Sequence, residues 1–258
     1  MKLPSFFIAH GSPLLALEDN EYTRFLERLG QELEAPRGIV VFSAHWDSPE
    51  QLLTVDELHE TQHDFYGFPE EVYTLTYPAP GDPALTRRIS ELFKDNNLSH
   101  QPVLGRGLDH GVWVILKKMF PNADIPVVAL SVDSLRSPKE QYNIGRMLAP
   151  LRDEGILLIG SGGLVHNLRM LSESEQPEDW ALEFDAWIAK GLEAWDLPSL
   201  FAYEKKAPHV RDAVPSYGRE HFAPLFYAMG TADGSRKAER IFQAYQYGTL
   251  SLNCWKLD

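Results

Sequence analysis

Short apolar runs alternate with amphipathic segments along this chain, and the alternation constrains the fold more than any other feature. Four runs lack the polar alternation of a half-exposed strand, so we expect strands covered on both faces at residues 5–9, 38–43, 125–131 and 155–160. Helical spacing marks residues 21–33, 83–93, 112–119, 139–151 and 180–195. This order predicts an α/β fold with a mostly parallel central sheet and helices on both faces.

The chain carries no sign of a division into separate domains. Its 258 residues show no internal repeat, no low-complexity tract and no Gly/Ser/Pro-rich linker, and 44% of them are hydrophobic. A chain of this length can enclose one large core, so we expect a single domain over residues 1–258. Residues 240–252 look strand-rich, and we expect them to form a hairpin that finishes the sheet at an edge.

Charge and composition exclude several classes of partner. The net charge is −13 and no run of Lys and Arg occurs, so nucleic acid is a poor partner for this chain. No apolar stretch is long enough to cross a bilayer and the first residues do not form a signal peptide, so we expect a cytoplasmic protein with no membrane partner. Cys254 is the single cysteine, which excludes an internal disulfide and a cysteine-based metal site.

Three histidines follow predicted strands. His10 and His45 come directly after or just beyond apolar runs, and His166 follows a third run by a few residues. The carboxyl ends of parallel strands lie along one rim of a sheet, so these distant side chains can converge there. Imidazole is a common ligand for Zn(II) and Fe(II). The alternative is that each histidine separately caps a strand or forms a hydrogen bond in the core.

Two further histidines are candidates for the same site. His221 lies near the start of a predicted helix, where a histidine is often structural. His110 directly precedes another predicted helix, and the helix N-terminus disfavours the charged imidazolium, so a neutral base is expected there.

An aromatic loop that includes a glycine is a candidate cover for a flat substrate. Its side chains are His63, Phe65, Tyr66 and Phe68, and we expect them to bind or stack on an aromatic ring. The alternative for this loop is simple packing at the surface. No zinc-peptidase His-Glu-x-x-His pair, no Gly-x-Ser-x-Gly elbow and no phosphate-binding loop occurs, so common hydrolase and NTPase mechanisms lose support.

Six ordered motifs resemble the 4,5-DOPA extradiol dioxygenase branch of the class III ring-cleavage dioxygenases. The similarity runs from residue 8 to about residue 230, and so many ordered matches make chance improbable. The motifs are Ala9-His10-Gly11-Ser12-Pro13, Ser43-Ala44-His45-Trp46, His63-Asp64-Phe65-x-Gly67-Phe68-Pro69, Tyr77-Pro78-Ala79-Pro80-Gly81, Asp109-His110-Gly111-x-Trp113 and Val165-His166-Asn167-Leu168.

The resemblance implies an enzyme that uses O₂ to open the ring of a small aromatic diol, a catechol of the DOPA type. It implies one divalent metal ion held by His10, His45 and His166, with His221 matching a further histidine at the metal, and His110 in the acid/base role. Relatives use non-haem Fe(II), and Zn(II) often occupies the site in purified protein. Relatives often carry a histidine before a proline where this chain has Val214, which leaves substrate preference open.

Two other functions remain possible from the sequence. The same histidines could activate water in a zinc-dependent hydrolase of a small acidic metabolite. The chain could also be a binding protein without catalysis on the same fold. Glu220 and Asp109 are less favoured carboxylate ligands, and the sequence indicates neither the physiological catechol, the position of ring cleavage nor the oligomeric state.

Overall fold

A twisted sheet forms the centre of the computed structural model, which describes residues 2–172, 174 and 176–258. Over these residues the sheet has eight strands in the order β4-β3-β5-β2-β6-β1-β10-β7. Their bounds are β1 Ser5–Ala9, β2 Gly38–Asp47, β3 Gln51–Thr54, β4 His100–Val103, β5 Val127–Val132, β6 Ile156–Gly162, β7 Ala238–Phe242 and β10 Cys254–Leu257.

The middle of the sheet is parallel and its ends are mixed. β5, β2, β6 and β1 pair in parallel, as do β3 and β4, whereas β3 joins β5 and β10 joins both of its neighbours in antiparallel fashion. The predicted mostly parallel α/β sheet is therefore confirmed. The central strands are buried almost throughout, as continuous apolar runs require.

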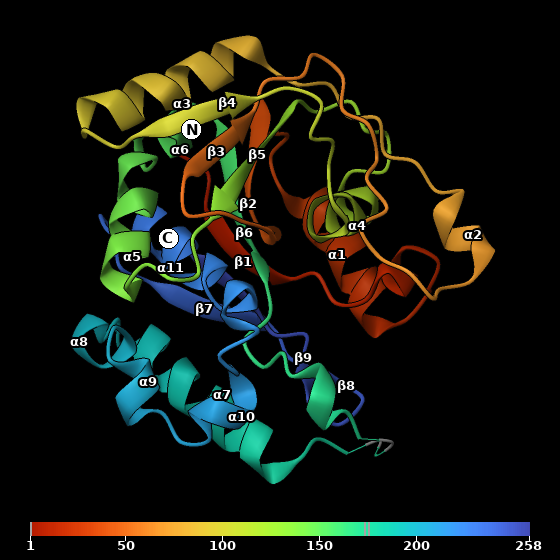
Figure 1. The fold of residues 1–258 in the computed structure, drawn as a ribbon, viewed down its shortest axis with the longest axis vertical. Coiled ribbons are helices and arrows are strands. Elements are labelled where there is room, and N and C mark those ends of the chain that lie inside the picture. The colour runs from red at the N-terminus through yellow and green to blue at the C-terminus, as the bar shows by residue number, and fades with distance from the viewer. Residues whose placement is uncertain (1, 173, 175) are drawn as a thin grey trace.

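Helices cover both faces of the sheet (Figure 1). One face packs its apolar side chains against α1 and α4, and the other against α3, α5, α6 and α11. Of the remaining helices, α7 to α10 gather in the cyan region of Figure 1, and α2 lies apart from them. Bounds are α1 Glu21–Glu32, α2 Glu70–Tyr73, α3 Pro83–Asp95, α4 His110–Met119, α5 Pro138–Met147, α6 Pro150–Asp153, α7 Asp179–Glu193, α8 Leu197–Leu200, α9 Tyr203–Lys206, α10 Val210–Ala213 and α11 Pro224–Thr231.

Local sequence explains where these helices begin and end. The Asp82 carboxylate accepts hydrogen bonds from the backbone N–H groups of Ala84 and Leu85, and Pro83 opens α3. The helix expected at 139–151 is in fact two, because α5 ends at Met147 and α6 starts at Pro150. Proline has no N–H to continue the helical hydrogen-bond ladder, so the prediction of one uninterrupted helix was wrong.

The C-terminal segment does finish the sheet at an edge, but its strands have other bounds than the expected hairpin at 240–252. β7 pairs with β10, which lies beyond the predicted 240–252 segment and inserts next to β1. Between them, β8 Tyr245–Gln246 and β9 Leu250–Ser251 form a separate two-stranded hairpin. Within the described ranges no helix has the length and apolar character needed to cross a bilayer.

Candidate metal centre

The parallel register brings the ends of β1, β2 and β6 to one rim of the sheet. Ala9 pairs with Gly162, and Ser43 pairs with Ser161, so the three strands end side by side. His10 follows β1 directly, and His45 lies in the last part of β2, beyond its regular pairing with β5 and β6. Two of the predicted site histidines are therefore neighbours despite their separation in the sequence.

His221 lies at the same rim, although it belongs to a segment much later in the sequence. It ends the 3₁₀ turn η3 Arg219–His221, just before α11, and its carbonyl accepts a hydrogen bond of 2.8 Å from the N–H of Gly163. A Cβ atom on Gly162 would lie 2.1 Å from that carbonyl oxygen. The glycines that follow Ser161 therefore allow η3 to approach the end of β6 closely.

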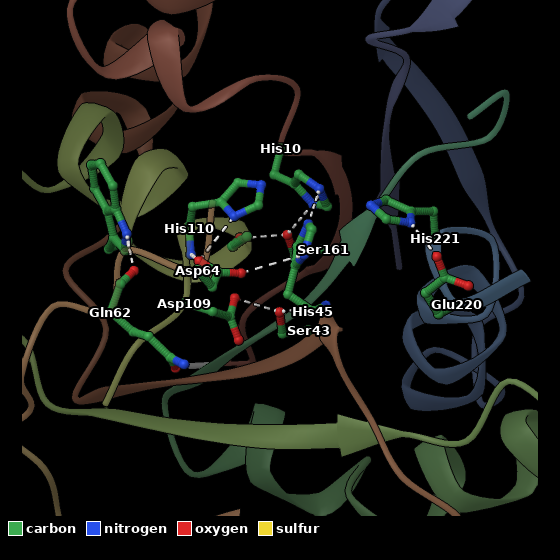
Figure 2. A network of polar contacts seen from close by, with 12 residues as sticks. His10, Ser43, His45, Gln62, Asp64, Asp109, His110, Ser161, Glu220 and His221 are labelled. Atoms are coloured by element: carbon green, nitrogen blue, oxygen red, sulfur yellow. Dashed lines mark hydrogen bonds and ion pairs between the residues drawn. The ribbon is translucent and has the colours of Figure 1, made fainter. Parts of the chain in front are cut away.

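Three imidazoles gather into a cluster that could hold a metal ion (Figure 2). One ring nitrogen each from His10, His45 and His221 lies within 4.8 Å of the others. The Nε2 atoms of His10 and His45 are 2.9 Å apart. Two imidazole nitrogens that bind one ion at about 2.1 Å and at right angles to each other lie about 3.0 Å apart. The spacing of this pair therefore fits two ligands of one ion.

Hydrogen bonds select the metal-binding tautomer of two of these rings. The Ser161 hydroxyl donates to the carbonyl of Gly111, so its oxygen accepts the hydrogen on Nδ1 of His10 at 3.1 Å. His221 places Nδ1 3.0 Å from the carboxylate of Glu220. Its Nε2 atom is buried and has no hydrogen-bond partner among the residues that the structure describes. Both rings thus present an unprotonated Nε2 to the cluster, as metal binding requires.

Burial keeps the cluster neutral. Desolvation, reinforced by the neighbouring histidines, lowers the pKa of His10 and of His221 well below the ordinary value. Burial and the charge of His110 also lower the pKa of His45, although Asp64 opposes the shift. Neutral imidazoles have a lone pair available at neutral pH, so a divalent cation meets no competing protons there.

His166 lies beside this cluster and not within it. Its ring stacks on the ring of His221, with centroids 3.5 Å apart and planes 4° from parallel. Burial lowers the pKa of His166 to about 4. The expectation that His166 joins His10 and His45 as a ligand stays a prediction.

His110 forms a second, overlapping group with His45 and Asp64. It is the first residue of α4, and its ring centroid lies 3.8 Å from that of His45. Its Nδ1 atom lies 3.0 Å from a carboxylate oxygen of Asp64. Burial alone would raise the pKa of Asp64, but hydrogen bonds from His110 and the charges of His110 and His45 lower it to about 2. Asp64 is therefore an anion between two imidazoles.

The aromatic loop divides into residues near the site and residues away from it. The ring of Phe65 meets the ring of His110 edge-on, with their centroids 5.6 Å apart. The ring of Phe68 packs on that of Phe65, with a centroid distance of 5.3 Å. The Nε2 atom of His63 is 3.1 Å from the carbonyl oxygen of Leu75. Tyr66 is 91% exposed. The substrate-binding role of all four side chains stays a prediction, and the geometry favours Phe65 most.

Sequence reasoning named no supporting residue around the histidines. Asp64 lies within one of the six motifs without a predicted role, and Ser161 is not among the predicted site residues. Asp109 is buried, and burial raises the pKa of its carboxyl group, which accepts a 2.7 Å hydrogen bond from Ser43. The available signal in the sequence was a polar residue next to a histidine at the end of a strand, because such a residue can form a hydrogen bond with the imidazole.

The fold and this cluster define a class of protein: an α/β protein with buried, neutral imidazoles at the rim of a parallel sheet, suited to one divalent metal ion. The family described as the catalytic LigB subunit of aromatic ring-opening dioxygenase matches residues 4–253. The chain belongs to this family of metal-dependent, extradiol ring-opening dioxygenases, which act on an aromatic substrate with O₂. The zinc-hydrolase and binding-protein alternatives are not favoured.

Individual relatives agree with the family. The chain is 40% identical to the 4,5-DOPA dioxygenase extradiol of Escherichia coli, over 97% of this chain and 93% of that protein. It is also 40% identical to the 4,5-DOPA dioxygenase extradiol of Beta vulgaris, over 98% of this chain and 95% of that protein. The crystal structure of an uncharacterized protein from Escherichia coli K12 superposes with a TM-score of 0.84 at 35% identity, and each chain is fully covered.

Proposed function

We propose that the protein opens the ring of a catechol with a DOPA-like side chain, with Fe(II) as its active metal. The observation that carries this proposal is the convergence of unprotonated Nε2 atoms from His10 and His221 with the ring of His45, next to His110. The printed names of the relatives from Escherichia coli and Beta vulgaris supply the DOPA part.

His10, His45 and His221 are the proposed ligands, and His166, which stacks on His221, is a further proposed ligand beside them. When bound, the ion would supply a double positive charge that attracts a catecholate and open positions that bring it together with O₂. Zn(II) binds imidazole equally well but has no redox chemistry, so it would fill the site without supporting the reaction.

His110 is the proposed acid/base group. With its Nδ1 hydrogen held by Asp64, its Nε2 atom is left to accept a proton from a substrate hydroxyl and to return one later. The edge-on contact between Phe65 and His110 places an apolar ring beside this imidazole. Phe65 would exclude water there and provide a surface for the flat substrate ring.

Oxygen uptake by the iron-loaded protein tests the proposal. The metal-free protein is loaded anaerobically with Fe(II) and then exposed to air with a panel of catechols, including DOPA. We expect one O₂ consumed for each ring opened, with a yellow semialdehyde product, and no uptake by the Zn(II)-loaded protein. Absence of O₂ uptake across the whole panel would contradict the proposal, and water-dependent turnover of a small acidic metabolite with Zn(II) would favour a hydrolase.

The His45→Ala variant separates metal binding from general damage. We expect this variant to lose metal and activity together while it keeps its helical circular-dichroism spectrum. Full metal occupancy in His45→Ala would refute the ligand assignment.

A further inference from the structure

Asp64 contacts two histidines that have different proposed roles. It lies in the loop between β3 and α2, and its side chain is 15% exposed. One carboxylate oxygen lies 3.0 Å from Nδ1 of His110, and the other lies 3.4 Å from Nδ1 of His45. Figure 2 shows the carboxylate below the ring of His110 and beside that of His45, with a dashed line to each.

The same carboxylate holds the start of α4. The oxygen that faces the ring of His110 also accepts a hydrogen bond of 2.9 Å from the backbone N–H of His110. In the described part of the chain the preceding residue, Asp109, makes no capping hydrogen bond of its own, because its carboxylate is taken by Ser43 and Arg106. Asp64 therefore replaces the usual cap and fixes which of its oxygens faces His110.

Both contacts favour the same tautomer, although only the one with His110 is a hydrogen bond. A carboxylate has no hydrogen to donate and repels the lone pair of a bare ring nitrogen, so the hydrogen of each ring is favoured on the Nδ1 atom that faces it. The Nε2 atoms of His45 and His110 are then unprotonated. The Nε2 atom of His45 is the one that lies 2.9 Å from Nε2 of His10 in the metal cluster.

We propose that Asp64 is a positioning residue that serves the metal ligand and the acid/base group at once, by holding His45 and His110 in the tautomer with a free Nε2 atom. The proposal rests on the proposed function for the roles of the two histidines, but the tautomers themselves can be measured without any metal or substrate.

Asp64→Asn distinguishes this role from simple packing. Asparagine has nearly the same shape, but it offers one oxygen and one NH₂ group. The oxygen stays beside His110, because the backbone N–H and Nδ1–H groups there would clash with a third donor. The NH₂ group then faces His45 and forces its hydrogen onto Nε2, the atom that must bind the ion.

We therefore expect Asp64→Asn to bind Zn(II) about 10- to 100-fold more weakly than the wild type, measured by competition with a chelator. Asp64→Ala should lose less affinity, because a water molecule can accept the Nδ1 hydrogen of His45 in the space left free. A merely structural role gives the opposite order, since the isosteric variant would be the milder one.

Asp56→Asn is the matched control. Asp56 also lies near a histidine, with 3.9 Å between its carboxylate and Nδ1 of His59, and the variant loses the same charge. We expect its Zn(II) affinity to equal that of the wild type.

Nitrogen-15 NMR of the metal-free proteins completes the test. In the wild type we expect His45 and His110 to carry hydrogen on Nδ1, and in Asp64→Asn we expect His45 to carry it on Nε2. Unchanged tautomers, or equal Zn(II) affinities for Asp64→Asn and wild type, would overturn the proposal. Two Zn(II) ions per wild-type chain, falling to one in Asp64→Ala, would overturn it too, because Asp64 would then be a ligand. If only O₂ uptake fails, the proposed function is contradicted, but the tautomers of His45 and His110 still support the role of Asp64.

Discussion

Ser161 determines which nitrogen of His10 is free to bind a metal. Its hydroxyl hydrogen is directed to the carbonyl of Gly111, so its oxygen is left to accept from Nδ1 of His10. Residues that orient a ligand in this way typically change metal affinity by one to two orders of magnitude when they are removed. The chemistry of the site therefore depends on an uncharged residue as well as on its histidines.

Ser161→Ala should weaken Zn(II) binding about 10- to 100-fold while the fold is retained, because the Nδ1 hydrogen of His10 loses its acceptor. Chelator competition measures the change. Ser131→Ala is the matched control, since Ser131 is equally buried but forms its hydrogen bonds with Leu52 and Glu50. An unchanged affinity in Ser161→Ala would remove this residue from the site.

His110→Ala should keep its metal and lose turnover. We expect ring opening to slow by about 10²- to 10⁴-fold, because a positioned acid/base group typically contributes that factor. Metal content and the rate of O₂ uptake are measured on the same sample. Loss of metal would identify His110 as a ligand, and an unchanged rate across pH would exclude it from the mechanism.

At the scale of elements, glycines decide how closely η3 and α11 approach the sheet. A Cβ atom on Gly160 would lie 2.3 Å from the carbonyl oxygen of Pro224, and one on Gly162 would lie 2.1 Å from that of His221. Backbone atoms cannot move aside as a flexible side chain can, so these two positions on β6 exclude any larger residue. The position of His221 thus depends on the strand that it faces.

Gly162→Ala should lower both the free energy of unfolding, by about 1 to 3 kcal/mol, and the metal affinity, because the added methyl group displaces the backbone of His221. Urea unfolding and Zn(II) competition measure the two effects. Gly163→Ala is the control, because its Cβ atom would meet the nearest atom, in His166, at an ordinary 3.5 Å. Equal behaviour of the two variants would show that η3 adjusts freely.

Over the whole molecule, the buried imidazoles make the stability of the metal-free protein sensitive to acid. The pKa of His166 is lowered to about 4 in the folded state, so only the unfolded chain takes up this proton between pH 6.5 and 4. The resulting stability is fully present above pH 6.5 and is lost as pH falls towards 4. His166→Gln should reduce the slope of unfolding free energy against pH by about 1.4 kcal/mol per unit in this window. A slope identical to that of the wild type would contradict the assignment.

Asp185 gives the folding stability the opposite dependence on pH. Burial raises its pKa to about 7, although hydrogen bonds from Tyr245 and Asn253 lower it. The folded protein then holds a proton that the unfolded chain releases above about pH 4, so this contribution to stability is full below pH 4 and is lost as pH rises to 7. Asp185→Asn should abolish that loss, which amounts to ~4 kcal/mol. Unfolding curves between pH 4 and 7 decide the matter, and a variant that keeps the wild-type slope would refute it.

The sequence by itself determined the layers of the fold and one rim of the sheet. Continuous apolar runs at β1, β2, β5 and β6 require cover on both faces, and parallel strands align their ends, so His10 and His45 had to be near each other. These are local patterns combined with one general rule of geometry. The break at Pro150 was also readable from the sequence, although the predicted helix ran through it.

The tertiary structure decided which groups complete the site. Whether His221 or His166 faces His10 depends on how η3 packs against β6, and the place of Asp64 depends on a long loop with no regular pattern. Contacts between segments more than a hundred residues apart in the sequence set the positions of the site side chains to within a few tenths of an ångström. No periodic pattern in the sequence predicts such contacts. Only the packed molecule sets distances between ring nitrogens, and those distances determine whether imidazoles can share one ion.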